Sequence, residues 1–87
     1  MKQLSRETFQ SDSVALVRIE PARKAYRFYR AALWPDLFGG VALVREWGRI
    51  GQPGRLRCDP YPDAAAARDA LERLARRKRR KGYRAAT

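Results

Sequence analysis

The 87-residue sequence predicts an α+β fold, in which one helix packs on one face of an antiparallel β-sheet of about four strands. Two observations predict it. Four short stretches of alternating or β-branched residues are separated by brief links containing proline or glycine, as in a meander of neighbouring strands. An alanine-rich stretch with helical spacing follows them, and its small side chains would let a helix lie close against the sheet.

The first two predicted strands cover residues 14–19 and 25–33. The first is short, apolar and β-branched, and Glu20-Pro21 closes it. The second alternates, with Tyr29 and Leu33 on one face and Phe28 on the other. Residues 34–40 then supply a loop with turn residues at both ends. Three nearby aromatic side chains are interpreted as packing residues: Trp34, Phe38 and Tyr61.

The third and fourth predicted strands cover residues 41–47 and 55–59, and residues 50–54 form a hairpin loop between them. Alternation places Arg45 and Trp47 on one face of the third strand. In the fourth strand, Arg55 and Arg57 share one face, and Leu56 and Cys58 share the opposite one.

Asp63 opens the predicted helix as its N-cap, with an acid placed favourably at the positive end of the helix dipole. One narrow apolar stripe faces the sheet, formed by Ala67, Ala70, Leu71 and Leu74. Gly82 is a natural end for the helix. The chain is therefore interpreted as one domain over residues 13–87, preceded by a flexible N-terminal arm over residues 1–12.

Charge is the strongest feature of the composition. Lysine and arginine total 20 against 9 acids, which gives a net charge of +11. Residues 1–20 carry no net charge, whereas residues 76–84 carry seven cations and no acid. Such a basic pole predicts a polyanionic partner, DNA or RNA. The dominance of arginine favours forked recognition of phosphate groups.

Several functional classes find no support in the sequence. Cys58 is the only cysteine and histidine is absent, which excludes an intrachain disulfide and metal sites of the Cys/His kind. No histidine is available for acid–base catalysis, no base partners a serine or cysteine nucleophile, and no phosphate-binding glycine loop is present. We therefore expect a binding protein that is not an enzyme and holds no cofactor. The lack of a signal peptide or membrane span predicts an intracellular, cytoplasmic location, associated with the nucleoid in a bacterial cell.

The segment Trp47-Gly48-Arg49-Ile50-Gly51 combines an aromatic face with a permanent cation at the end of a strand. It resembles the WGR domain, which is named for the same triplet. Other landmarks of the family occur in the family's order: Arg27-Phe28-Tyr29-Arg30, Asp59-Pro60-Tyr61-Pro62 and the ending Lys78-Arg79-Arg80-Lys81-Gly82-Tyr83. The resemblance covers residues 14 to 84. It implies the same α+β architecture and a chain that turns back onto the fold at Tyr83.

The resemblance also implies roles for the triplet. In the DNA-dependent poly(ADP-ribose) polymerases, the tryptophan packs on the terminal nucleotide at a break, and the arginine contacts DNA and neighbouring domains. These roles would fall to Trp47 and Arg49, with Gly48 allowing close approach of a ligand. The alternative is that Trp47 finishes a strand inside the core and Arg49 is a solvated turn residue.

Further candidates for DNA contact are basic residues near the triplet and at the helix end. Arg45 shares the face of Trp47, so it either faces the ligand or pairs with an acid across the sheet. Arg55 and Arg57 either track phosphates or simply form a solvated row. The basic run at the helix end contributes the rest of the predicted site: Arg77, Lys78, Arg80 and Lys81.

The sequence thus predicts a freestanding module that recognises DNA ends or nicks, a task that belongs to DNA repair. Phosphate contacts would supply most of the affinity, and the tryptophan a preference for an interrupted duplex. Two alternatives stay open. The module could instead be an adaptor that docks a separate repair or nucleic-acid enzyme, or it could bind RNA.

Overall fold

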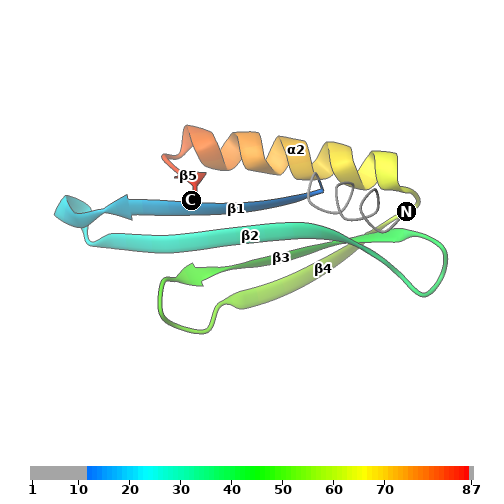
Figure 1. Cartoon of the computed structure of the whole chain (residues 1–87), viewed down its shortest axis with the longest axis horizontal. Helices are drawn as coiled ribbons and strands as arrows, with labels where there is room; N and C mark the ends of the chain where they lie inside the picture. The colour runs from blue at the N-terminus through cyan, green and yellow to red at the C-terminus, as the bar shows by residue number, and fades with distance from the viewer. Residues whose placement is uncertain (1–11, 87) are drawn as a thin grey trace, which may run out of the picture.

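The computed structural model describes residues 12–86. It consists of one five-stranded antiparallel sheet with the strand order β4-β3-β2-β1-β5, and one long helix lies over one face of it (Figure 1). The elements are β1 (Ser13–Glu20), the 3-10 turn η1 (Pro21–Arg23), β2 (Ala25–Pro35), β3 (Val41–Arg49), β4 (Arg55–Tyr61), α2 (Ala64–Arg80) and β5 (Arg84–Ala85). The α+β class is confirmed, with five strands instead of about four.

The fifth strand is a two-residue addition that pairs with β1. Gly82 has a φ of 98°, which lets the chain reverse after the helix. Arg84 and Ala85 then pair with Val17 and Leu16. Two residues are too few for a periodic pattern, so alternation could not reveal this strand.

Strand β2 continues to Pro35, two residues beyond its predicted end. Asp36 makes the extension possible, because its Oδ1 accepts hydrogen bonds from the N–H groups of Phe38 (2.8 Å) and Gly40 (2.9 Å). This side-chain turn closes the hairpin within five residues. The predicted packing of Trp34 and Phe38 is wrong, because their side chains are 50% and 93% exposed, respectively.

The core lies between α2 and the sheet. The predicted apolar stripe of the helix is confirmed, since Ala67, Ala70, Leu71 and Leu74 are all buried in the core. They form one cluster with Tyr83, which follows the helix, and with buried side chains of the sheet: Leu16, Tyr29, Ala31, Leu33 and Leu43. Tyr61 packs against this cluster, as expected. Asp63 is the N-cap, since its Oδ1 accepts the Ala66 N–H at 2.9 Å.

Residues 1–11 of the predicted arm lie outside the described part of the chain. Asp12, placed at the end of that arm by the sequence, is described and is buried. Its two carboxylate oxygens accept hydrogen bonds from Arg68 at 2.7 Å and 3.1 Å, and its carbonyl accepts the Leu33 N–H. These contacts fasten the start of β1 to both the helix and β2.

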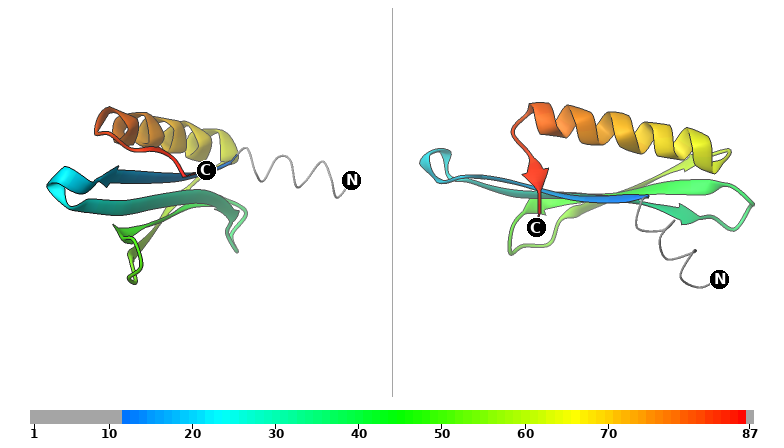
Figure 2. Two further views of the ribbon diagram at one scale, coloured as in Figure 1. Left: turned by 60° about the vertical axis from the view of Figure 1, so that its left-hand side comes forward. Right: turned by 45° about the horizontal axis from the view of Figure 1, so that its top comes forward.

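Helix α2 covers one face of the sheet and leaves the other uncovered (Figure 2). The strand registers give these two faces unlike residues. Helix-facing positions carry most of the strand charges, among them Arg45, Arg55 and Arg57. The other face, which we call the open face, carries mainly apolar residues. Within the described residues, α2 is not long and apolar enough to cross a membrane, and no group of acids and cysteine could hold a metal ion.

Candidate nucleic-acid interface

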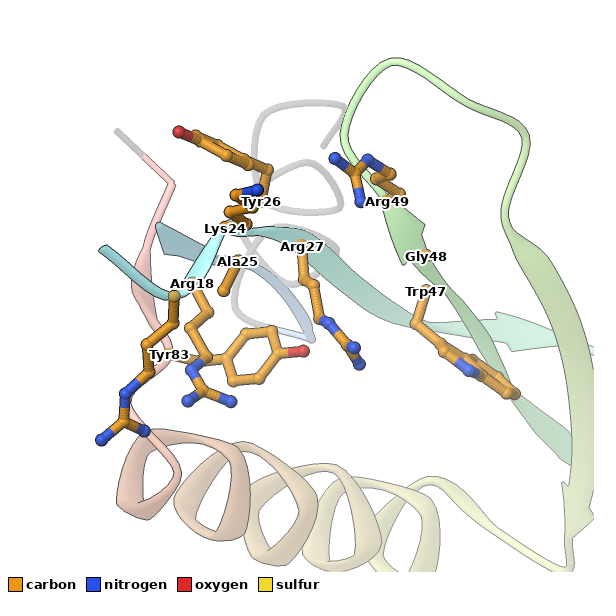
Figure 3. A pocket seen from close by; sticks show the side chains of 10 residues that line it. Arg18, Lys24, Ala25, Tyr26, Arg27, Trp47, Gly48, Arg49 and Tyr83 are labelled. Atoms are coloured by element: carbon orange, nitrogen blue, oxygen red, sulfur yellow. The ribbon is translucent and has the colours of Figure 1, made fainter. Parts of the chain in front are cut away.

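A hollow of 510 Å³ opens where the β1–β2 turn meets the end of β3, on the side of the sheet that carries the helix (Figure 3). We call it the basic hollow. Cations and aromatic rings make up most of its lining: Arg18, Arg23, Lys24, Ala25, Tyr26, Arg27, Trp47, Gly48, Arg49 and Tyr83. No acid belongs to this lining. Figure 3 shows Arg27 reaching toward the space between Tyr83 and Trp47, while Tyr26 turns its ring away.

Three arginines start side by side across the floor of the basic hollow. Arg18 on β1 lies opposite Arg27 on β2, which lies opposite Arg49 on β3. Neighbouring strands are only about 4.8 Å apart, so like charges at opposed positions destabilise the sheet. Glu20 hydrogen-bonds Arg18 at 3.2 Å, which lowers the pKa of the Glu20 carboxyl. No ion pair of the described residues involves Arg27 or Arg49.

Trp47 occupies the wall of the basic hollow and is only partly buried. It packs against the core cluster, and its ring stacks with Tyr29 at a centroid distance of 6.2 Å and an interplanar angle of 23°. The guanidinium of Arg45 lies 5.8 Å from the Trp47 ring centre. Trp47 is therefore neither sealed in the interior nor free in solvent. One part of the indole anchors the strand and another lines the hollow.

Arg45 holds its position through an acid and the aromatic rings. Its Nη2 donates to Asp59 Oδ2 at 3.0 Å, and Arg57 Nε donates to Asp59 Oδ1 at 3.1 Å. The Arg57 hydrogen bond, reinforced by Arg45, lowers the pKa of Asp59. Burial raises the pKa of the Tyr29 hydroxyl, which the positive charge of Arg45 opposes. Arg45 is therefore already paired with an acid across the sheet, as the alternative interpretation of this residue allowed. Arg57 is exposed and pairs with the same acid.

Lys78 is a partly buried cation beside the basic hollow. Its Nζ lies 4.7 Å from the ring centre of Tyr29 and 5.3 Å from that of Tyr83. Burial lowers the pKa of Lys78, and the neighbouring charges of Lys81 and Arg77 lower it further. Among the described residues it contacts no carboxylate. A cation held in this way lacks a counter-charge that an anion would supply.

The other predicted site residues lie around this centre. Arg55 lies opposite Trp47 on β4 and is exposed. Arg77 is near enough to Tyr29 to affect the pKa of its hydroxyl. Arg80 and Lys81 are exposed at the end of α2 and do not line the basic hollow. The structure thus brings Trp47 and its triplet together with Lys78 of the helix end, while Arg80 and Lys81 stay outside.

A family comparison agrees with this geometry. The family model for the WGR domain matches residues 12–87. The chain belongs to the WGR domain family. Members of this family serve as nucleic-acid-binding modules in proteins related to poly(ADP-ribose) polymerases.

Comparison with curated proteins gives one relative, the uncharacterized protein y4dW of Sinorhizobium fredii. It is 37% identical over 67 residues, which are 77% of this chain and 33% of the relative. The chain thus spans a third of the length of the relative that it matches. No solved structure matches the chain.

The glycine of the WGR triplet has a role inside the fold. A Cβ on Gly48 would lie 2.9 Å from the Cα of Gly54 and 3.5 Å from the Phe28 ring. The register puts Gly48 on the same face as Phe28, which is the open face and not the side of Trp47. The close approach on this face is therefore made by the β3–β4 loop of the chain itself, while Gly48 also lines the basic hollow.

Four cations and two aromatic residues of the basic hollow were not among the predicted site residues: Arg18, Arg23, Lys24, Arg27, Tyr26 and Tyr83. A signal for some of them was present. The short turn after Pro35 fixes the β2–β3 register, and this register puts Arg27 directly opposite the arginine of the WGR triplet. Tyr83 reaches the hollow only because the chain reverses at Gly82, which strand alternation does not reveal.

Proposed function

We propose that this WGR domain binds nucleic acid in the basic hollow and prefers DNA whose backbone is interrupted at an end or a nick. The row formed by Arg18, Arg27 and Arg49, next to a partly exposed Trp47, is the observation that carries the proposal. A row of like charges weakens the sheet on its own. A polyanion would relieve this repulsion, so the row suits a charged partner better than a solvated surface.

The proposed roles follow from the geometry. Arg27 and Arg49, which have no acid partner among the described residues, would bind phosphate oxygens through their planar guanidinium groups. Lys78 would act as a further phosphate contact at the helix end. The part of Trp47 that lines the hollow would pack against a terminal base or sugar, which is accessible only where the duplex is interrupted. Arg45 would support the indole from behind and make no phosphate contact of its own.

Replacement of Trp47 by alanine tests the preference for ends. It should weaken binding to a nicked or blunt-ended duplex by on the order of 1–3 kcal/mol, the typical contribution of one stacked base. Binding to a closed circular duplex should change little. Trp34→Ala is the matched control, because Trp34 lies on the open face and is 50% exposed. Equal losses on nicked and closed DNA would rule out end recognition.

Salt dependence separates phosphate binding from protein docking. For duplex DNA, the logarithm of the binding constant should fall with the logarithm of salt concentration, with a slope of about −0.9 per neutralised phosphate. An adaptor that docks a separate repair enzyme would show a much shallower slope. Competition between matched RNA and DNA duplexes distinguishes the two nucleic acids. We propose DNA repair as the setting of this activity, in the cytoplasm.

A further inference from the structure

The open face of the sheet is apolar, and no element of the described chain covers it. Helix α2 lies entirely on the opposite side in every view (Figures 1 and 2). Large apolar side chains of the open face are strongly exposed, with values of 53% for Ile19, 50% for Trp34 and 68% for Leu56. Val17, Phe28 and their neighbours fill the space between them. A continuous apolar sheet face of this kind marks a contact surface.

Two loops border this surface at opposite ends of the strands. The β2–β3 loop and the β3–β4 loop both bend away from the helix, toward the side of the open face (Figure 2). The first carries Leu37 and Phe38, which are 95% and 93% exposed, and the second carries Ile50, which is 42% exposed. The turn at Asp36 holds the first loop through two side-chain hydrogen bonds. Its apolar residues are thus presented to solvent by an ordered turn.

Charge on the open face differs sharply from charge on the helix side. The strand registers place three charged residues on it: Arg30 and Glu46, which form an ion pair of 2.7 Å, and Arg84, which lies opposite Val17 on the edge strand β5. In a chain with a net charge of +11, two arginines and one glutamate give this face a net charge of only +1. A phosphate would find there one guanidinium that is already paired and one at the edge of the sheet. The partner of the open face is consequently a neutral apolar surface and not a nucleic acid.

We propose that a second copy of this chain occupies the open face, so that two sheets pack face to face in a twofold dimer. The arrangement of the face suits a self-complementary contact. Hollows of 450 Å³ and 400 Å³ lie on either side of Arg30 and Glu46, and both residues line both hollows. In a twofold contact the two central ion pairs meet and can exchange partners, which keeps all four enclosed charges compensated.

The size of the surface approaches that of a stable dimer interface. Strands β1 to β4 are 8, 11, 9 and 7 residues long. With strands about 4.8 Å apart and about 3.3 Å per residue, they give a flat face of roughly 500 Å² per copy. The bordering loops add to this area on the same side, toward the roughly 800 Å² per partner of a standard interface.

The position of the cations also favours a second copy. Arg18, Arg27 and Arg49 all start on the helix side, so a contact through the open face turns both basic faces outward. Repulsion between the two copies is then weak, because charges separated by more than about 8 Å are screened at physiological salt. Such a dimer would present two basic hollows on opposite sides. A role of these two hollows in DNA binding rests on the proposed function, whereas the dimer itself does not.

Sedimentation equilibrium of the full chain without nucleic acid tests the proposal. The wild type should show twice the monomer mass, and added salt should strengthen the association because it screens the net positive charge. Leu56→Glu should weaken dimerisation by roughly a hundredfold or more, since each copy would enclose an unpaired carboxylate. Arg55→Gln is the control. It changes the net charge by the same single unit, one residue away on the opposite face of β4.

The outcomes are decisive in both directions. Wild-type protein that stays monomeric would overturn the proposal, and so would a dimer that persists in Leu56→Glu or is lost equally in Arg55→Gln. Circular dichroism checks that each variant folds, which the exposure of Leu56 favours. Arg30→Glu is a second variant, which places two adjacent carboxylates on each copy and should also yield monomers. DNA binding is measured separately, so a failure of one proposal leaves the other intact.

Discussion

Replacing Lys78 with methionine should weaken DNA binding without weakening the fold. The ammonium group lies over two rings, at 4.7 Å from the Tyr29 centre and 5.3 Å from the Tyr83 centre. Each such contact stabilises by about 0.5–1 kcal/mol. Burial and the repulsion by Lys81 and Arg77 act against the charged form and lower the pKa of Lys78. Methionine keeps the apolar stem and packs well against aromatic rings.

The expected magnitudes differ for stability and binding. The free energy of unfolding of Lys78→Met should stay unchanged or rise, by no more than about 1 kcal/mol. A charge-assisted phosphate contact is worth about 1.5–3 kcal/mol, so affinity for a nicked duplex should fall by roughly tenfold to a hundredfold. The slope of the salt dependence should also become shallower by about 0.9. Arg79→Met is the control, because Arg79 is exposed and lines a different hollow from the basic hollow.

The pH dependence gives the same prediction a second check. The folded state binds the Lys78 proton less tightly than the unfolded state, whose lysine titrates near 10.5. The wild type should therefore gain stability relative to Lys78→Met as pH rises from the lowered pKa toward 10.5, and its DNA affinity should fall over the same range. Fluorescence anisotropy measures binding and chemical denaturation measures stability. A variant that binds DNA like the wild type, or loses several kcal/mol of stability, would refute this reasoning.

Two further predictions concern the frame of the site. Gly48→Ala should lower the free energy of unfolding by about 1–3 kcal/mol, because the added methyl group would overpack against Gly54 and Phe28. Thermal denaturation measures this loss, and an unchanged melting temperature would contradict the close contact between Gly48 and the β3–β4 loop. Asp59 has a pKa below its ordinary 3.8 because of its hydrogen bond from Arg57, so its stabilisation is complete at neutral pH. That stabilisation should be lost as pH falls below 3.8 toward the lowered pKa, and Asp59→Asn should show a shallower acid transition than the wild type; identical profiles would count against the ion pair.

The sequence was sufficient for the class of fold because alternation and helical spacing report burial directly. The strands around Leu43 and the stripe around Leu71 each contact a single core, so their periodic patterns identify the buried faces. Boundaries were less predictable where side chains decide them. The turn at Asp36 extends β2 through two hydrogen bonds that no periodic pattern indicates.

The candidate site was predictable only in part, since its residues come from distant segments. Trp47 and Arg49 were found from the WGR triplet. Lys78 was found from its charge, but its place over Tyr29 depends on how the helix crosses the sheet. Arg18 could not be predicted from alternation within one strand, because its position beside Arg27 follows from the register between strands.

Fluorescence of Trp47 tests the central claim most directly. The chain has two tryptophans, so Trp34→Phe leaves Trp47 as the single reporter, and Trp34 lies on the open face away from the basic hollow. Titration with a nicked duplex should quench the emission of Trp47 in parallel with binding measured by anisotropy. A closed circular duplex should bind with little quenching. Tight binding of nicked DNA with unchanged Trp47 emission would contradict contact between the indole and an interrupted strand.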